Sequence, residues 1–411
     1  MIRAPVRSSR SEFPDRRRPD GAGGRPCKID EMTFTAEHDA LRETIRDFVS
    51  KELRPHAEAW EEAEYFPDSV FTRMGELGFL GLRYPEAYGG QGGDYFAAIV
   101  LAEEMSRAGS GGVGMAISVQ AEMATPPIFK FGTEEQKQKY LVPAIKGTKV
   151  AALGITEPDA GSDVANIRTR ADKVDGKWRI NGSKLYITNG VRWDFIVLVC
   201  RTGTQEEGAK GITLFIVDKN LPGVSVSRKL KKLGMHSSDT AELAFTDVEV
   251  GDDAILGEVG QGFYHLMWEL QGERMIGSAG AIAGAEVAFE HTLQWCKDRE
   301  AFGRPIGKFQ VNKHKLVDMY TDITVAKNFV YSVAEKWDRG EYPVSEISMT
   351  KLVVGRVVAQ VADHCMQLFG GMGYMAENPI ARYFRDSRLI RIGAGTDEVM
   401  KEIIAKTALG L

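Results

Sequence analysis

Gly154-Ile155-Thr156-Glu157-Pro158-Asp159-Ala160-Gly161-Ser162-Asp163 lies where the hydrophobic pattern of the chain changes. Before it, from Thr35 to about Tyr140, apolar residues recur at helical spacing. After it they form short runs separated by turns. The segment combines glycines, hydroxyls and small residues, which let backbone amides approach a planar or anionic ligand closely. An ordinary turn-rich loop explains the same composition equally well.

The region from about Val150 to Val259 predicts a sheet. Asp175-Gly176 is a hairpin turn signal ahead of the strand-like run Lys177–Gly182. Further strand-like runs follow at Phe195–Cys200, Gly211–Val217, Val224–Ser227 and Ala241–Val248. Because no helix separates these strands, we expect an antiparallel sandwich or barrel.

From Gly262 onward the pattern is helical to the end of the chain. The predicted helices, which would form a bundle, are Gly262–Lys297, Gln310–Arg339, Val344–Leu368 and Asp397–Ala408. The fold class is therefore α+β. We expect a helical N-terminal domain (residues 32–149), a central antiparallel β-barrel domain (150–261) and a C-terminal four-helix bundle (262–411).

The first 31 residues differ from the rest. They carry eight basic and five acidic residues, with prolines and glycines but no apolar periodicity, so we expect a disordered leader. Arginines and a few serines favour a transit peptide, whereas the acidic residues and the missing amphipathic stripe oppose it. The alternative is that Met32 is the true start.

Composition excludes several functional classes. The chain has 411 residues, of which 43% are hydrophobic and 27% charged, as in ordinary globular proteins. It contains no uncharged apolar run of about 18 residues, so no transmembrane helix is expected. A net charge of −5 without a polybasic face in the body argues against a nucleic-acid partner. The cysteines form neither a CxxC pair nor a disulfide framework, which fits a reducing compartment: Cys27, Cys200, Cys296 and Cys365.

Three other motifs are weak alone. Gly109–Gly114 matches G-x-G-x-x-G, but it follows a helical stretch, so we interpret it as a loop or helix kink and not as a dinucleotide site. Arg299–Pro305 suits either a phosphate clamp or a helix end. Gln367–Tyr374 suits either backbone contact with a ligand or a tight interhelical turn. Neither HExxH nor G-x-S-x-G occurs, and no metal site is predicted.

Glu273, next to Arg274, is the most unusual charged residue of the predicted helices. It falls on the apolar stripe that contains Leu266, Leu270 and Gly277. A carboxylate on an apolar face should have a raised pKa, which suits a general base. The competing interpretation is a buried glutamate paired with an arginine elsewhere in the bundle.

In this order, the motifs resemble the acyl-CoA dehydrogenase family over roughly residues 34–411. The resemblance rests on Gly154–Asp163, on Arg299–Gly303, and on Gln367 through Gly373 with Glu377, Arg382 and Asp386. It implies the same three-domain order, FAD as cofactor and a homotetramer. It also implies dehydrogenation of an acyl-CoA thioester to the trans-2-enoyl-CoA, in which a carboxylate removes the α-proton and the β-hydrogen leaves as hydride to flavin N5.

The resemblance also implies which residues bind the cofactor and substrate. Residues expected around the flavin ring are Leu153, Gly154, Ile155, Thr156, Ser162, Tyr186, Ile187 and Thr188, with Tyr186 where many relatives have tryptophan. Residues expected to hold the FAD of a neighbouring subunit are Arg299, Phe302, Gln310, Gln367, Gly370 and Gly371. Thr396 and Glu398 match the family's Thr-x-Glu contact to FAD. Ser162, Arg274 and Gly395 are the expected substrate contacts.

The resemblance also bears on the base. Many short- and medium-chain members carry it immediately before Gly-Thr in the C-terminal loop, where this chain has Ala394. Isovaleryl-CoA and long-chain members place it on a helix just before an arginine, and Glu273-Arg274 matches that arrangement. We therefore expect Glu273 to be the catalytic base.

The resemblance is least specific about the substrate. Residues 392–396 look like isovaleryl-CoA dehydrogenase, whereas residues 114–128 and 235–240 look more like citronellyl-CoA and related bacterial enzymes. Small residues at Gly277, Gly280 and Gly284 leave room for a longer chain or allow close helix packing. We expect a medium, long or branched acyl-CoA, used in β-oxidation. Electron transfer flavoprotein is the implied acceptor.

Two other functions share this fold, namely a flavin oxidase or monooxygenase that uses O₂ and a flavin-free scaffold subunit. The Glu273-Arg274 pair favours the dehydrogenase over the oxygen-using enzymes, and intact FAD-loop residues argue against the scaffold. The expected compartment is the cytoplasm of a bacterium, or the mitochondrial matrix if the leader is a transit peptide.

Overall fold

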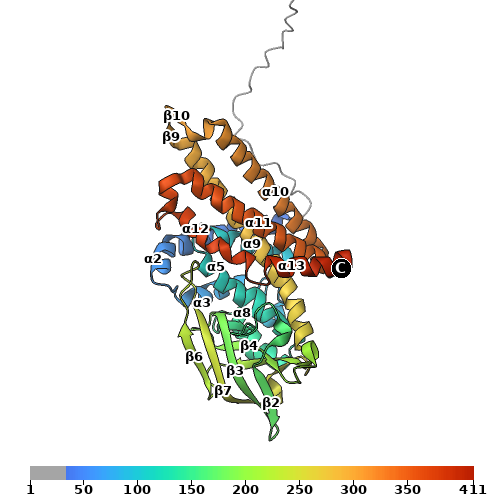
Figure 1. Cartoon of the computed structure of the whole chain (residues 1–411). Helices are drawn as coiled ribbons and strands as arrows, with labels where there is room; N and C mark the ends of the chain where they lie inside the picture. Colours follow the sequence, from blue (N-terminus) through green and yellow to red (C-terminus); the bar gives the residue numbers. More distant parts are fainter. Residues whose placement is uncertain (1–33) are drawn as a thin grey trace, which may run out of the picture.

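The computed structural model describes residues 34–411 (Figure 1). The expectations for the leader and for Met32 as a start lie outside the described residues. Among the described helices, none combines the length and apolar character that crossing a membrane requires.

The N-terminal domain is helical, as predicted. Its main helices are α1 (Ala36–Phe48), α2 (Ala57–Glu62), α3 (Ser69–Glu76), α4 (Tyr95–Met105), α5 (Gly111–Ser118), η6 (Val119–Ala124), α6 (Thr125–Phe131), α7 (Glu134–Gln136) and α8 (Val142–Ile145). His38 Nε2 of α1 lies 2.8 Å from Asp94 Oδ1. Asp94 also caps α4, because its carboxylate accepts a hydrogen bond from the Ala97 backbone N–H at 3.1 Å. This contact fixes α1 against α4, a helix that is buried on nearly every side.

The Gly109–Gly114 motif joins two helices, as predicted. A 3₁₀ turn, Ser106–Ala108, follows α4, and Gly109 then adopts a left-handed φ of 77° before α5 begins. Within residues 34–150 no strand precedes the motif, so the βαβ unit of a dinucleotide site is absent there.

The central domain contains one eight-stranded sheet. Its strands are β1 (Ala151–Gly154), β2 (Arg170–Val174), β3 (Lys177–Thr188), β4 (Phe195–Arg201), β5 (Ile212–Asp218), β6 (Val224–Lys229), β7 (Thr240–Val250) and β8 (Ile255–Leu256). The order is β6-β7-β3-β2-β4-β5-β8, with β1 beside β4. The Asp175-Gly176 turn joins β2 to β3, and the predicted strands are confirmed.

The pairing of β4 corrects one detail of the prediction. Most neighbouring strands are antiparallel, but β1 pairs with β4 in parallel, and β2 meets β4 in parallel at Arg170 and Arg201. A parallel pair needs a long connection, and here β2 and β3 supply it. Local periodicity carries no signal for such long-range pairing.

The C-terminal domain is helical, as predicted. It contains α9 (Gly262–Asp298), α10 (Gln310–Asp338), α11 (Val344–Phe369), α12 (Pro379–Ser387) and α13 (Asp397–Ile404). The short helix α12 was not predicted. Two short strands, β9 (Glu300–Ala301) and β10 (Arg304–Pro305), form a hairpin between α9 and α10. Figure 1 shows this hairpin at the end of the molecule away from the sheet.

The 37-residue helix α9 connects the domains. It is about 55 Å long at 1.5 Å per residue. It packs against α4 of the N-terminal domain, β5 of the sheet and the helices α10 and α11. In Figure 1 it runs from beside the sheet into the C-terminal helices. A side chain about a third of the way along it, such as that of Glu273, therefore lies where three domains meet.

Candidate active site

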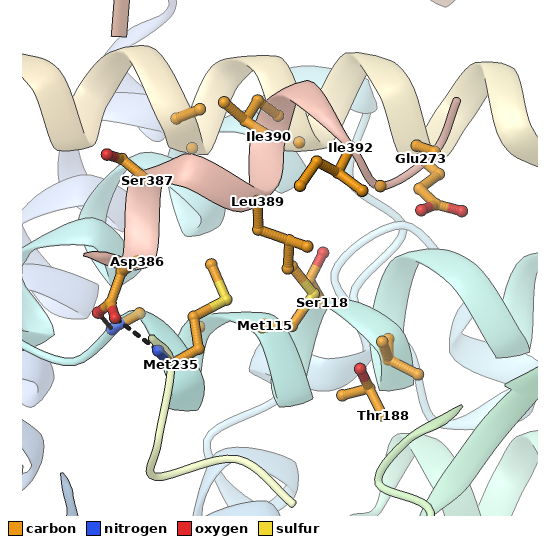
Figure 2. A pocket seen from close by; sticks show the side chains of 18 of the residues that line it. Met115, Ser118, Thr188, Met235, Glu273, Asp386, Ser387, Leu389, Ile390 and Ile392 are labelled. Atoms are coloured by element: carbon orange, nitrogen blue, oxygen red, sulfur yellow. Dashed lines mark hydrogen bonds between the residues drawn. The ribbon is translucent and has the colours of Figure 1, made fainter. Parts of the chain in front are cut away.

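A cavity of about 1350 Å³ opens between the three domains. Its wall comes from α4, α5 and η6, from β1 and β3, from α9, and from residues 389–396 after α12. In Figure 2, Glu273 projects from α9 at one end of this space and Asp386 lies at the other. Leu389 and Met115 lie between them, so an apolar stretch separates the two carboxyl groups.

A buried ion pair holds the Gly154–Asp163 loop to the sheet. Lys184 Nζ donates a hydrogen bond to Glu157 Oε1 at 2.7 Å. Glu157 also accepts from the backbone N–H of Arg168 at 2.6 Å and of Thr169 at 3.0 Å. Burial acts to raise the pKa of Glu157, but Lys184 and these hydrogen bonds hold it below the ordinary value. The loop is thus anchored by a carboxylate that accepts three hydrogen bonds.

Tyr186 reaches the cavity through an irregularity in β3. The register between β3 and β7 shifts between Lys184 and Ile187, and Tyr186 has a φ of 63°, which is uncommon for a bulky residue. As a result residues 185–188 all line the cavity instead of alternating across the strand.

Glu273 has the environment expected of a base. Its side chain is half-buried and lines the cavity. Burial raises its pKa to about 7, against the lowering effects of Arg274 and Lys351. A carboxyl group that titrates near neutral pH can be ionised and still take up a proton readily.

Two cations hold the loop that follows α12. Arg274 Nε donates to Ala394 O at 2.9 Å, and Lys351 Nζ donates to Ile390 O at 2.8 Å and to Gly395 O at 2.6 Å. Ala394 and Gly395 have φ values of 54° and 99°. Burial lowers the pKa of the Lys351 amine to about 8. The loop therefore keeps a left-handed backbone that three hydrogen bonds to buried cations stabilise.

Most residues expected at the site meet in this cavity. Its wall contains Leu153, Ile155, Thr156, Ser162, Tyr186, Ile187, Thr188, Glu273, Arg274, Gly395 and Thr396. Thr396 also caps α13, because its hydroxyl accepts from the Val399 N–H at 3.3 Å.

The other expected residues lie outside the cavity wall. They are Gly154, Arg299, Phe302, Gln310, Gln367, Gly370, Gly371 and Glu398. A Cβ on Gly154 would meet the Ile196 side chain at 2.8 Å, so this glycine faces the sheet. All the others are exposed, and Phe302 is 96% exposed. Their role toward a neighbouring subunit stays a prediction.

Sequence reasoning missed two buried groups. Lys351 interrupts an apolar stretch of α11, and this interruption is visible in the sequence. The carbonyl groups that it binds are not, because they lie about forty residues later. Glu269 stands four residues before Glu273 and is 2% exposed. Neither oxygen of Glu269 has a hydrogen-bond partner within residues 34–411.

The cavity residues fit the FAD that the resemblance implies. Thr156, Ser162, Thr188 and Thr396 bring hydroxyl groups to the wall, and a Cβ on Gly161 would have nothing within 4 Å. The volume of about 1350 Å³ exceeds the roughly 300–1,000 Å³ of a single-ligand pocket, which leaves room for a flavin ring and an acyl group together. Within the described chain, His, Cys, Asp and Glu side chains form no cluster able to hold a metal.

Comparison with known proteins covers nearly all the described chain. Acyl-CoA dehydrogenase domain models match residues 35–148 (N-terminal), 152–248 (middle) and 260–409 (C-terminal). Mitochondrial isovaleryl-CoA dehydrogenase of Solanum tuberosum is 38% identical over 377 residues, covering 91% of each chain. Mitochondrial long-chain specific acyl-CoA dehydrogenase of Mus musculus is 39% identical over 374 residues, covering 91% of this chain and 86% of the relative. The crystal structure of acyl-CoA dehydrogenase from Geobacillus kaustophilus has a TM-score of 0.90 and 42% identity, covering 92% of this chain and 100% of the other.

Proposed function

The chain belongs to the acyl-CoA dehydrogenase family, and from this premise we propose that it converts a saturated acyl-CoA to the trans-2-enoyl-CoA with Glu273 as the base. Members of the family are FAD-dependent flavoprotein oxidoreductases of fatty-acid β-oxidation. The observation that carries the proposal is the half-buried Glu273 carboxyl, with a pKa of about 7, on an apolar cavity wall.

Glu273 has one task in this reaction. The α C–H bond breaks and its proton moves to a Glu273 carboxylate oxygen. The β C–H bond gives up its hydrogen as hydride, and a double bond forms between the two carbons. When bound, FAD supplies the acceptor for that hydride. The surrounding apolar wall keeps water from competing for the proton and from screening the charges.

The loop after α12 supports Glu273 as the base. Ala394 occupies the position where many relatives carry the base, and it offers no titratable group. Arg274 binds the Ala394 carbonyl and lies next to Glu273, so the same cation links the loop to the base. Arg274 is therefore placed to orient Glu273 and the nearby part of the substrate, together with Ser162 and Gly395.

The acyl group should be medium, long or branched. Gly277, Gly280 and Gly284 follow Glu273 along the cavity wall. A Cβ on Gly277 would meet only Ile390 Cδ1, at 3.9 Å, so this position borders open space. The relatives named for isovaleryl-CoA and for long-chain substrates support the same range.

The proposal extends to partners and assembly. We expect a homotetramer, because Arg299, Phe302 and Gln367 are exposed here and suit the FAD of a neighbouring subunit. Electron transfer flavoprotein is the proposed acceptor of the electrons. Relatives include bacterial and mitochondrial enzymes, and we propose the bacterial cytoplasm as the compartment.

Anaerobic mixing of the purified flavoprotein with a panel of straight and branched acyl-CoAs tests the proposal. Prompt bleaching of the flavin by one group names the substrate class, whereas no bleaching by any of them contradicts the proposal. Stoichiometric peroxide formation in air would favour an acyl-CoA oxidase instead, and a colourless protein would favour a scaffold subunit.

Gly277→Leu tests the acyl site. The added side chain should project into the cavity and lower kcat/KM for long acyl-CoAs at least about tenfold relative to short ones, since one or two lost methylene contacts are worth roughly 1–3 kcal/mol. Gly272→Ala is the matched control, because a Cβ there meets nothing within 4 Å and Gly272 is not in the cavity wall. An unchanged chain-length profile in Gly277→Leu would place the acyl chain elsewhere.

A further inference from the structure

Glu269 lies one helical turn before the proposed base, Glu273. The proposed reaction gives Glu269 no role. It is 2% exposed, and both its oxygens lack a hydrogen-bond partner within residues 34–411. Burial first, and then the neighbouring charge of Glu273, raise the pKa of Glu269 well above the ordinary value. Burial without a partner therefore favours the neutral form of the Glu269 carboxyl, which has a proton to donate.

Among the titratable groups of α9 that act on Glu269, one can accept its proton. Arg274 is a donor only, and its Nη1 is itself buried without a partner. The Glu273 carboxylate is the remaining titratable group of this helix that acts on Glu269. Lys351 faces Glu273 from α11 and is already bound to two loop carbonyls.

Groups on the other elements are already paired. Tyr95 of α4 donates its hydroxyl proton to the Gly272 carbonyl at 3.1 Å. Beyond Tyr95, Arg83 and Glu122 form an ion pair at 2.7 Å. Among the neighbouring carboxylates, Glu273 is the one whose charge acts on Glu269, which makes it the natural acceptor of the Glu269 proton.

Building on the proposed role of Glu273, we propose that Glu269 is the positioning residue of the base: a neutral carboxyl that donates a hydrogen bond to the Glu273 carboxylate. Side chains four residues apart on a helix have Cβ atoms about 5–6 Å apart, a spacing at which the two carboxyl groups are within reach of each other. The pair holds one proton while the base is ready and two after the α-proton has moved to Glu273.

The hydrogen bond has a definite consequence for the base. A donor to the charged form stabilises it, so Glu269 keeps Glu273 ionised in an apolar wall that otherwise favours the neutral form. It also fixes the carboxylate in one orientation, which favours transfer of the α-proton. The two groups titrate as a pair, and the apparent pKa belongs to both.

The pH dependence of flavin reduction tests this role in the holoenzyme. In Glu269→Leu, loss of the donor should raise the apparent pKa on the acidic side of the pH–rate profile by about one unit. Glu269→Gln keeps an N–H donor of nearly the same shape and should restore the wild-type value of this apparent pKa. Glu290→Gln, an exposed carboxyl on the same helix, is the matched control and should match the wild type.

Two outcomes overturn the proposal. A downward shift in both variants would mean that Glu269 is ionised and repels Glu273, and unchanged profiles would mean that Glu269 only fills space. Retained high reduction rates in Glu273→Gln would instead refute the base itself, so the two failures are distinguishable.

Infrared spectroscopy gives a second readout that needs no turnover. At neutral pH, holoenzyme Glu273→Gln should show the carbonyl stretch of a protonated carboxyl that disappears in the double variant Glu269→Gln/Glu273→Gln. If the band is the same in both proteins, Glu269 is not protonated and the proposal fails. This comparison stands even if Glu269→Leu does not fold.

Discussion

Two buried carboxyl sites differ in how completely their oxygens are satisfied. In the sheet domain, Glu157 accepts hydrogen bonds from Lys184 and from two backbone N–H groups, and its pKa lies below the ordinary value. On α9, Glu269 has no partner within residues 34–411, and burial raises the pKa of both Glu269 and Glu273. The same residue type is thus stabilised as an anion in one domain and destabilised in another.

The difference in pKa between the two sites indicates a structural role for Glu157 and a chemical role for Glu273. A carboxylate that pairs with a buried lysine and accepts two backbone hydrogen bonds is a poor base, because these contacts stabilise its charged form. A carboxyl group such as Glu273, whose pKa burial raises to about 7, takes up a proton readily near neutral pH. Glu157 therefore holds the loop that frames the cavity, whereas Glu273 lines the cavity and suits the proposed role of base.

Glu273→Gln should give the largest effect. Removing the base should slow flavin reduction by acyl-CoA about 10²–10⁴-fold, the usual contribution of general-base catalysis. The glutamine fills the same volume, so FAD content should stay at the wild-type level. Stopped-flow reduction under anaerobic conditions measures the rate, with Glu290→Gln as the control. A loss of less than tenfold would assign proton removal to another group.

Glu157→Gln should give the next largest effect, on stability and not on chemistry. It leaves the fully buried Lys184 without a charge partner, which should cost about 3–5 kcal/mol of unfolding free energy. The urea midpoint of the holoenzyme measures this loss. Glu249→Gln is the control, because its 3.3 Å pair with Lys177 is exposed and should be worth about 0–1 kcal/mol. Equal shifts in both variants would contradict the contrast between the sites.

The pH dependence of stability should give a smaller effect with a definite sign. The pKa of Glu273 rises from 4.5 to about 7 on folding, so the folded protein holds more protons and wild-type stability falls as pH rises through that range. Glu273→Gln has no carboxyl group at this position, so its stability should not fall for this reason. It should match the wild type below pH 4.5 and be more stable above pH 7, by on the order of 1–3 kcal/mol.

Thermal unfolding of both holoenzymes across this pH range measures the difference. If Glu273→Gln is the less stable protein at pH 8, then Glu273 is stabilised as an anion, like Glu157. That result would contradict the difference between the two sites.

Local pattern predicts elements well and long-range partners poorly in this chain. The ends of α9, α10 and α11 follow from helical periodicity to within one residue. The parallel pairing of β1 with β4 and the bond from Arg274 to a carbonyl 120 residues away leave no local trace.

For the candidate site, the sequence indicates residue types but not what satisfies them. Glu273 is visible as a carboxylate on an apolar stripe, and the resemblance indicates its role. Glu269 is visible only as another charged residue, because the absence of a partner depends on how α4 and α9 pack. The expected role of Arg299 and Phe302 toward a second subunit comes from the resemblance alone, because the periodicity of one chain carries no signal for it.

Exchange of the α-proton with solvent is the most direct test of the central claim that Glu273 removes it. An acyl-CoA analogue with sulfur in place of the β-carbon can lose an α-proton but has no β-hydrogen to transfer. Incubated in D₂O and followed by mass spectrometry, the wild-type holoenzyme and Glu290→Gln should incorporate deuterium at the α-carbon, and Glu273→Gln should not. Deuterium incorporation by Glu273→Gln at the wild-type rate would contradict the account.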